Sequence, residues 1–383
     1  MTSSNLQNSH STNNSRKICY GVVGLGAFAQ NAALPAFSSA DNSELVALVS
    51  GDVTKRVELA QKYGIQNTYS YEEYDDFLMS GNVDAVYIAL PNHLHCEYTV
   101  RAAQAGIHVL CEKPMAVLVE ECEAMIKAAA DHNIKLMIAY RLHLEEANLA
   151  AVEIVRSGHL GELRIFNSLF TQQTVAGNIR VQKAVGGGTL DDIGIYCINA
   201  ARYIFQDEPI AVFATTANNG EERFREVDEM TSVILRFPGD RLATFTCSFG
   251  AAEVSSYQII GTKGSLIVDH AYSVNEDITH ILNIGDETQE RTFKNQNQDQ
   301  LAAEFIYFSD CILHNKNIEP SGKEGLIDIQ IIRALYQSID LGSFVEINTI
   351  DRQQRPTLDQ IVIVPLTHPE PDLINAEPPS GKS

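Results

Sequence analysis

The most informative stretch of this 383-residue chain is KICYGVVGLGAFAQ, residues 17–30. Its apolar run is typical of a buried strand, and a glycine-rich turn follows directly. Gly24 permits the tight turn, Gly26 lets the backbone approach a pyrophosphate, and Ala29 allows a helix to pack closely on the strand. The first amides of that helix point at the phosphates. The stretch therefore predicts a dinucleotide site rather than a plain glycine turn. The residues expected to contact the cofactor are Gly24, Gly26, Ala27, Phe28 and Ala29.

Short β-branched runs alternate with helical patterns from this turn to about residue 140. The runs that read as strands are KICYGVVGLG (17–26), ELVALVS (44–50), AVYIAL (85–90), HVLCEK (108–113) and KLMIAY (135–140). The helical patterns between them are KRVELAQKYG (55–64), HCEYTVRAAQAG (95–106) and VLVEECEAMIKAAADHN (117–133). Such alternation is the signature of a parallel sheet with helices on both faces. Residues 17–140 are therefore predicted to form a doubly wound Rossmann domain, which binds ligands at the carboxyl ends of its strands.

After about residue 141 strands and helices no longer alternate, and most of the predicted strands follow one another directly. These strands are ELRIFNSLF (162–170), IAVFATTA (210–217), TSVILRF (231–237), RLATFTCSF (241–249), SYQIIG (256–261) and GSLIVD (264–269). Along RLATFTCSF an apolar face alternates with a largely hydroxyl-bearing face. We expect an α+β domain over residues 141–347, with an open, mostly antiparallel sheet that helices cover on one face. The helices expected to cover this sheet span residues 301–315 and 324–340.

Bulk composition is that of a globular protein. Hydrophobic residues make up 45% and charged residues 20% of the chain, and its length favours two domains with flexible ends. The net charge of −21 argues against general binding to nucleic acid or to an anionic membrane, because both need a basic surface. No apolar run approaches the ~20 residues of a membrane span. Seven scattered cysteines without C-x-x-C spacing predict reduced thiols rather than disulfides or a zinc site.

Both ends of the chain differ from the rest. Residues 1–16 are polar and predict a disordered leader. Residues 348–383 are rich in proline and acidic residues, and we expect an extended tail there that is mobile or draped on the surface.

The tip of the second predicted strand bears on the choice between NADP and NAD. An NAD site usually has an acidic residue there for the ribose hydroxyls, whereas an NADP site supplies cations. Ser50 stands at the tip, and Asp52 is expected to cap the next helix. Together with Lys55 and Arg56 at the start of that helix, Ser50 favours NADP, with NAD possible. Solvated basic residues at an ordinary helix start are the alternative.

Two later strand ends carry groups suited to the nicotinamide half of the cofactor. Pro91, Asn92 and His95 follow the strand at 85–90, where they either contact the cofactor or only shape a loop. His93 and His95 have no further ligand at metal spacing, so no metal site is predicted.

The strand at 108–113 ends in Glu112-Lys113-Pro114. Pro114 biases Lys113 towards extended backbone, so that the ammonium group projects over the ligand cleft. A solvated lysine at a strand end is the alternative. We expect both Glu112 and Lys113 to contact the cofactor.

The segment GGGTLDDIGIYCIN, residues 186–199, combines three glycines with two adjacent aspartates and a tyrosine. A helix is expected to begin at Leu190 under a Thr189 cap, with Asp192 in the capping-box position. The glycines would let the chain pass close to the nicotinamide. Asp192 as a mere cap, and Tyr196 as an amphipathic edge of the core, are the alternatives. The residues that share a second, polar face of this helix are Asp192, Tyr196, Asn199 and Tyr203.

Four signals occur here in the order in which one enzyme family carries them. They are G-x-G-x-x-A from Gly24, P-N-x-x-H from Pro91, E-K-P from Glu112 and G-G-G-x-L-x-D-x-G-x-Y from Gly186. From about Lys17 to residue 347 the chain resembles the Gfo/Idh/MocA oxidoreductases, most of all the glucose-fructose oxidoreductase branch.

The resemblance implies that Lys113, Asp192 and Tyr196 surround the reacting carbon, and that Arg141 contacts the substrate. Most relatives have histidine at the position of Tyr196. Tyrosine is characteristic of the glucose-fructose oxidoreductase branch and of the dihydrodiol and xylose dehydrogenase branches. Tyr196 therefore limits the resemblance to these branches of the family.

Oxidation of an alcohol needs a hydride acceptor on one side of the carbon and a proton acceptor near the hydroxyl. Tyrosine has an ordinary pKa of about 10, so a cation such as Lys113 is needed to favour the phenolate. We expect Tyr196 to be the general acid/base, with Lys113 tuning it and Asp192 orienting the pair or the substrate.

The predicted function is that of an NADP(H)-dependent oxidoreductase acting on the CH–OH group of a sugar, such as a pyranose, or of a related polyol. A trans-dihydrodiol or D-xylose dehydrogenase is the close alternative. A dinucleotide-binding regulator without chemistry is the alternative from another class; it could lack Lys113 or Tyr196, and this chain keeps both.

The open sheet face needs a partner, and in the family it often pairs with a second subunit, so we expect a homodimer or homotetramer. Glucose-fructose oxidoreductase is exported by a twin-arginine signal, whereas this sequence has no adjacent arginine pair. A cytoplasmic location is therefore expected.

Overall fold

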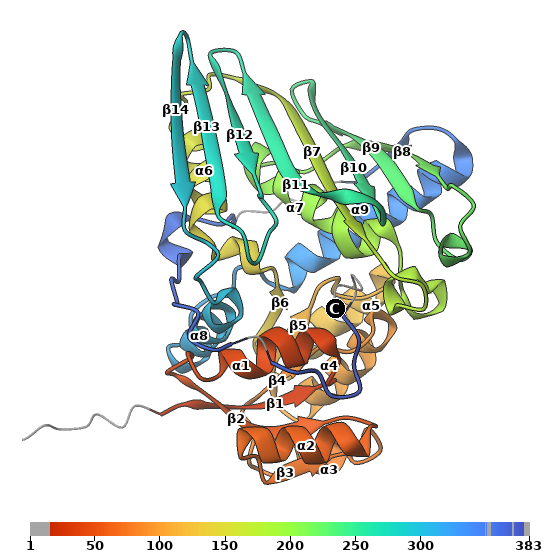
Figure 1. Cartoon of the computed structure of the whole chain (residues 1–383), viewed down its shortest axis with the longest axis vertical. Helices are drawn as coiled ribbons and strands as arrows, with labels where there is room; N and C mark the ends of the chain where they lie inside the picture. Colours follow the sequence, from red (N-terminus) through yellow and green to blue (C-terminus); the bar gives the residue numbers. More distant parts are fainter. Residues whose placement is uncertain (1–15, 349, 351–353, 370, 379–383) are drawn as a thin grey trace, which may run out of the picture.

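Two β-sheets organise the chain in the computed structural model, which describes residues 16–348, 350, 354–369 and 371–378 (Figure 1). The sheet built from residues 18–139 is called the N-terminal sheet, and the one built from residues 163–346 is called the C-terminal sheet. The predicted leader at residues 1–16 lies outside the described residues except for Arg16. No helix of the described part of the chain is long and apolar enough to cross a bilayer.

The N-terminal sheet is wholly parallel and has the strand order β3-β2-β1-β4-β5-β6. Its strands are β1 (Ile18–Val23), β2 (Ser43–Val49), β3 (Asn67–Tyr69), β4 (Ala85–Ile88), β5 (His108–Glu112) and β6 (Leu136–Ala139). The helices of this part are α1 (Leu34–Ala36), α2 (Val53–Tyr63), α3 (Tyr74–Leu78), α4 (His95–Gln104) and α5 (Val119–Asp131). The Rossmann architecture is confirmed. Sequence patterns missed β3, because a half-buried strand of three residues has no clear periodicity.

The C-terminal sheet has the order β14-β13-β12-β11-β7-β10-β9-β8-β15 and is antiparallel except between β7 and β10. Its strands are β7 (Leu163–Gln173), β8 (Ala211–Ala217), β9 (Met230–Phe237), β10 (Arg241–Ser248), β11 (Gly250–Gly261), β12 (Gly264–Asp269), β13 (Ile278–Ile284), β14 (Glu287–Phe293) and β15 (Val345–Glu346). The mostly antiparallel sheet is confirmed, with its hairpin of β9 and β10. The hairpin of β13 and β14 was not predicted.

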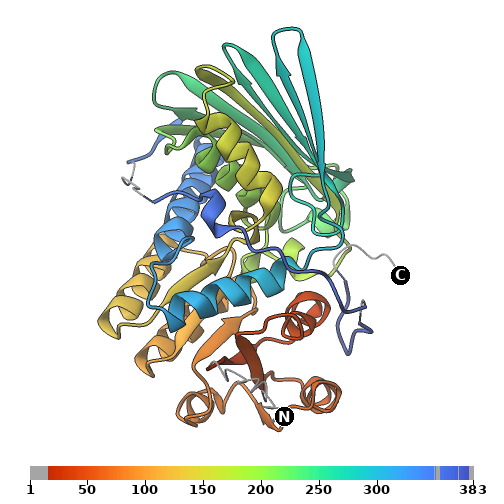
Figure 2. The same cartoon turned by 90° about the vertical axis from the view of Figure 1, so that its left-hand side faces the viewer.

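Helices cover one face of the C-terminal sheet, as Figure 2 shows. They are α6 (Glu146–Arg156), α7 (Ile195–Phe205) and α9 (Gly322–Leu341). The expectation for residues 301–315 was wrong, because α8 (Gln300–Leu313) packs against β1 and β2 of the N-terminal sheet. Phe305 contributes to this packing of α8, because its ring lies against the rings of Tyr20, Phe37 and Tyr87.

Candidate functional site

The glycine turn after β1 leaves room for a ligand. Gly24 has φ +96°, and a Cβ there would lie 2.5 Å from the Ala89 carbonyl oxygen, so only glycine fits. A Cβ at Gly26, in contrast, would meet nothing within 4 Å. The helical stretch from Ala27 begins beside this open space, which suits a pyrophosphate. Ala29 is buried and Phe28 is exposed.

The predicted helix cap at the tip of β2 is confirmed. Asp52 caps α2, where its carboxylate accepts a hydrogen bond of 3.1 Å from the Lys55 amide. Ser50 is buried, and its hydroxyl accepts from the Asp52 amide at 3.2 Å. Arg56 lies 3.7 Å from Glu73. The hydrogen bond from the Lys55 amide lowers the pKa of Asp52, so Asp52 caps α2 as a carboxylate.

The loop after β4 carries Asn92 and His95, which were both expected to contact the cofactor but lie in different surroundings. Asn92 donates a hydrogen bond of 2.8 Å to the Gly186 carbonyl and so ties this loop to the glycine run. His95 is 0% exposed, and its ring nitrogens lie 2.9 Å from the carbonyl oxygens of Leu90 and Pro114. His95 therefore supports the two strand ends, which corrects the expectation that it contacts the cofactor. The sequence placed His95 correctly after β4. It could not show that both ring nitrogens bond backbone carbonyl groups and leave none for a ligand.

Lys113 and Asp192 meet between the two sheets. The Lys113 ammonium donates to the Asp192 carbonyl at 2.8 Å and lies 3.2 Å from a carboxylate oxygen of Asp192, with side-chain exposures of 13% and 15%. Burial lowers the pKa of Lys113, but the neighbouring Tyr196 and Asp192 outweigh burial and leave this pKa raised. Lys113 is therefore held as a cation. Beside it, Glu112 is bound by the Tyr87 hydroxyl at 2.5 Å.

Arg180 is a site residue that sequence reasoning missed. Its Nε donates to the second carboxylate oxygen of Asp192 at 2.7 Å. Burial raises the pKa of Asp192, but Arg180 and Lys113 more than offset that effect and hold it below its usual range. Arg180 lies in a short 3-10 turn (Ile179–Val181) inside an irregular loop, so no periodicity marks it.

The start of the helix after the glycine run differs from the expectation. Thr189 has helical backbone angles and makes no capping bond, because its hydroxyl pairs with that of Thr231 at 2.8 Å. The helix opens with a π turn, Leu190–Gly194, before α7. The capping box was therefore wrong, and the Asp192 carboxylate faces Lys113 instead.

Tyr196 lies between two cations. The centroid of its ring is 4.9 Å from Lys113 Nζ and 5.2 Å from Arg141 Cζ. Arg141 is 6% exposed, and its guanidinium donates to the Tyr272 carbonyl and to Gln300, each at 2.5 Å. Arg141 is thus a fixed neighbour of Tyr196 and not a mobile arm in the cleft.

A small pocket joins these groups. The residues that line it are Lys113, Tyr140, Arg141, Leu142, Ile195, Tyr196, Asn199 and Tyr203. Three members of the predicted polar helix face, Tyr196, Asn199 and Tyr203, are among them. An ammonium group from the end of β5 and a phenol from α7 therefore converge on one cavity.

The glycine run is required by protein contacts. A Cβ at Gly186 would lie 2.9 Å from Asn92 Cβ, and one at Gly188 would lie 2.5 Å from the Tyr336 hydroxyl oxygen. That hydroxyl donates to Asp191 at 2.6 Å, and Arg333 also pairs with Asp191. The run thus lets this segment press against the loop after β4. Among the described residues, no group of three or more His, Cys, Asp or Glu side chains could hold a metal ion.

Two protein-family models match the chain. One, described as "Oxidoreductase family, NAD-binding Rossmann fold", matches residues 18–140. The other, described as "GFO/IDH/MocA C-terminal domain", matches residues 148–267.

Individual relatives cover most of the chain. D-xylose 1-dehydrogenase [NADP(+)] of Haloarcula marismortui is 32% identical over 336 residues, which span 86% of this chain and 93% of that protein. The crystal structure of aldose-aldose oxidoreductase from Caulobacter crescentus, complexed with glycerol, is 36% identical, with a TM-score of 0.82 over 87% of this chain and 100% of that one. KijD10, a 3-ketoreductase from Actinomadura kijaniata solved with NADP and TDP-benzene, is 26% identical, with a TM-score of 0.78 over 85% of this chain and 98% of that one.

Proposed function

The chain belongs to the GFO/IDH/MocA family of NAD(P)-dependent oxidoreductases, and from this premise we propose that it transfers a hydride between NADP(H) and a carbinol carbon of a sugar or related polyol. One observation carries the proposal. Lys113 and Tyr196, which come from different layers of the molecule, lie 4.9 Å apart, measured from the ammonium nitrogen to the ring centroid, and both line one pocket.

The nicotinamide supplies the hydride acceptor or donor when it is bound. Tyr196 takes the proton from the substrate hydroxyl during oxidation and returns it during reduction. Lys113 Nζ and Arg141 Cζ lie 4.9 and 5.2 Å from the centroid of the Tyr196 ring, where their charges would stabilise negative charge on this side chain while the proton is transferred. Asp192, itself held by Arg180, fixes the Lys113 ammonium in place.

The cofactor is proposed to lie along the carboxyl edge of the N-terminal sheet. Gly24, Gly26 and the helix start at Ala27 would hold the pyrophosphate. We propose NADP as the cofactor, because a hydroxyl and two basic side chains at the tip of β2 suit its extra phosphate: Ser50, Lys55 and Arg56. The xylose dehydrogenase relative is also NADP(+)-dependent. Phe28 and Ala29, beside Ala27, are further proposed contacts at the glycine turn. The proposed contacts towards the nicotinamide are Pro91, Asn92, Glu112 and Lys113.

A dehydrogenase of the xylose or dihydrodiol type is the second candidate. Xylose dehydrogenase is among the relatives above, and trans-1,2-dihydrobenzene-1,2-diol dehydrogenase of Macaca fascicularis is 29% identical over 64% of this chain. A regulator without chemistry fits less well, because such a protein has no need for an ammonium group fixed beside a phenol.

Tyr196→Phe tests the proposal. The variant keeps the ring packed against Phe170 and Tyr272 but removes the proton acceptor, so turnover should fall by about 10² or more. NADPH binding, followed by its fluorescence, should be unchanged. The native enzyme would first be screened with pyranoses, pentoses and a dihydrodiol, each with NADP and NAD. Near-normal turnover of the variant would remove Tyr196 from the mechanism.

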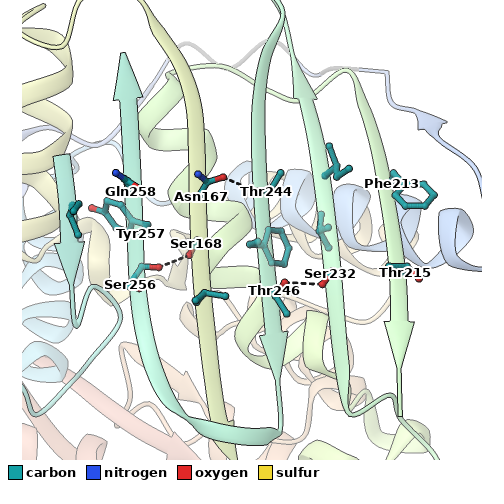
Figure 3. A pocket seen from close by; sticks show the side chains of 15 residues that line it. Asn167, Ser168, Phe213, Thr215, Ser232, Thr244, Thr246, Ser256, Tyr257 and Gln258 are labelled. Atoms are coloured by element: carbon teal, nitrogen blue, oxygen red, sulfur yellow. Dashed lines mark hydrogen bonds between the residues drawn. The ribbon is translucent and has the colours of Figure 1, made fainter. Parts of the chain in front are cut away.

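We also propose that the open face of the C-terminal sheet joins two or more copies of the chain. Among the side chains drawn in Figure 3, Thr244 donates to Asn167 at 2.6 Å and Ser232 pairs with Thr246 at 2.8 Å on this face. Exposed aliphatic groups such as Leu169 lie among these hydroxyl groups. A face of paired hydroxyls and exposed aliphatic groups suits a self-complementary interface.

Two further points belong to the proposal. Strand β6 ends at Ala139 and β7 begins at Leu163, which supports a domain boundary at residues 140–141 and a second domain over 141–347. A cytoplasmic location is proposed because all seven cysteines are free, as is typical of reducing compartments.

A further inference from the structure

The described part of the C-terminal tail runs from the C-terminal sheet to the nucleotide end of the molecule. At Val364 and Leu366 the tail exchanges backbone hydrogen bonds of 2.8 Å with Asp299 and Asn297. It then continues past α1, and Figures 1 and 2 both show the dark-blue segment beside that helix. Residues 371–378 are called the C-terminal strap.

The first anchor of the strap is Gln30, which follows the glycine turn and is 1% exposed. Its amide makes a reciprocal pair with Ile374: Nε2 donates to the Ile374 carbonyl at 2.9 Å, and Oε1 accepts from the Ile374 amide at 2.8 Å. The same Nε2 donates to the Leu25 carbonyl at 2.9 Å. One side-chain amide therefore ties the strap directly to the glycine turn.

The second anchor is Asp52 at the tip of β2. Asn375 donates from its side-chain amide to Asp52 Oδ2 at 3.3 Å, while Oδ1 of Asp52 caps α2. Asn375 has φ +46°, a left-handed conformation that asparagine adopts more readily than most residues. The strap thus bends at the residue that makes this contact.

The two anchors stand on either side of the AMP half of a dinucleotide. In this fold the pyrophosphate lies at the glycine turn, and the adenosine ribose lies at the tip of the second strand. We infer that the C-terminal strap closes over the AMP half of the bound cofactor and slows its release. This inference rests on the proposed function, because it assumes that NADP(H) binds at this edge.

Two shortened chains test the strap. A chain that ends at residue 370 lacks the strap, and a matched control that ends at residue 378 keeps it. Each would be loaded with NADPH and mixed with excess NADP, and the loss of NADPH fluorescence would give the dissociation rate. Loss of the anchoring hydrogen bonds should speed release by about tenfold or more, with no change in the control. Equal dissociation rates for the two chains would overturn the inference that the strap slows release. Failure of the full chain to bind NADPH would instead overturn the proposed function.

A charge exchange tests the second anchor without shortening the chain. Asn375→Asp is nearly isosteric but places a carboxylate opposite Asp52, so release should be faster. Adding Asp52→Asn should restore slow release, because an amide and a carboxylate again face each other and asparagine also caps helices well. Fast release in the double variant would mean that the new carboxylate repels the cofactor phosphates directly, and this would count against the strap. Native rates in Asn375→Asp would count against it as well.

Discussion

The side chain of Tyr196 owes its proposed chemistry to what holds its two cationic neighbours. Lys113 is fixed by the Asp192 carboxylate, and Arg141 is fixed by Gln300 and by the Tyr272 carbonyl. Neither cation has to be ordered when the substrate arrives, so their attraction for a phenolate is available in the transition state without reorganisation.

Arg141→Met should lower turnover by about tenfold, because one of the two charges beside Tyr196 is lost. The measurement is kcat at saturating substrate and cofactor, with NADPH binding followed by fluorescence to check that the fold is kept. Arg141→Lys keeps the charge and should recover most of the turnover. Native turnover in Arg141→Met would limit Arg141 to a packing role.

Local patterns placed Lys113 at the end of a strand and Tyr196 on a polar helix face, and both line one pocket. They expected Asp192 as a helix cap, and only the family resemblance placed it beside Lys113. They did not predict Arg180, whose contact with Asp192 depends on how an irregular loop folds back. They also misplaced His95, since a histidine that bonds two backbone carbonyls looks the same in sequence as one that faces a ligand.

Helix α8 shows the limit of prediction at the scale of elements. Its apolar stripe was evident, but periodicity gives the existence of a buried face and not the surface that covers it. The stripe packs on β1 and β2 through Phe305. Strand β14 was missed for another reason: six of its seven residues are exposed, so it lacks the alternation that marks a half-buried strand.

Helix α9 carries buried acidic groups that make its packing depend on pH. Arg202 of α7 pairs with Asp328 at 2.5 Å and with Glu324 at 2.9 Å, and all three side chains are 0% exposed. Burial raises the pKa of Asp328 to about 6, although the attraction of Arg202 opposes the rise. Glu208 also binds Arg202, at 2.5 Å, so three carboxylates share one guanidinium in a poorly solvated place. The native state therefore favours a proton on Asp328.

Asp328→Asn should flatten the pH dependence of thermal stability. Between about pH 4 and 6 the native state keeps a proton on Asp328 that the unfolded chain releases, so this group makes the native state more stable as the pH falls from 7 to 5. Melting temperatures at pH 5, 6 and 7 would show a smaller rise towards pH 5 in the variant. Asp286→Asn, in the exposed turn between β13 and β14, is the control and should keep the native slope. Equal slopes in Asp328→Asn and the native protein would contradict the assignment.

The relative placement of the two sheets completes the site at the scale of the whole molecule. Helix α9 packs on both β6 and β8, and α8 bridges to the N-terminal sheet, so the end of β5 and the start of α7 are held face to face. Each half was predictable as a class, since one alternates strands and helices and the other does not. Their mutual orientation was not, because it depends on helix surfaces whose partners lie far away in the sequence.

Leu169→Arg should break the proposed oligomer. Leu169 lies on β7 in the middle of the C-terminal sheet and is 46% exposed, so a self-pairing face would bury the new charges without partners. Light scattering at micromolar concentration should give the native chain at least twice the 42.2 kDa of one copy, and the variant that of one copy. Val57→Arg, on the exposed surface of α2, should keep the native mass. A native chain that scatters as a single copy would reject the oligomer, and a variant with the native mass would move the interface away from this face.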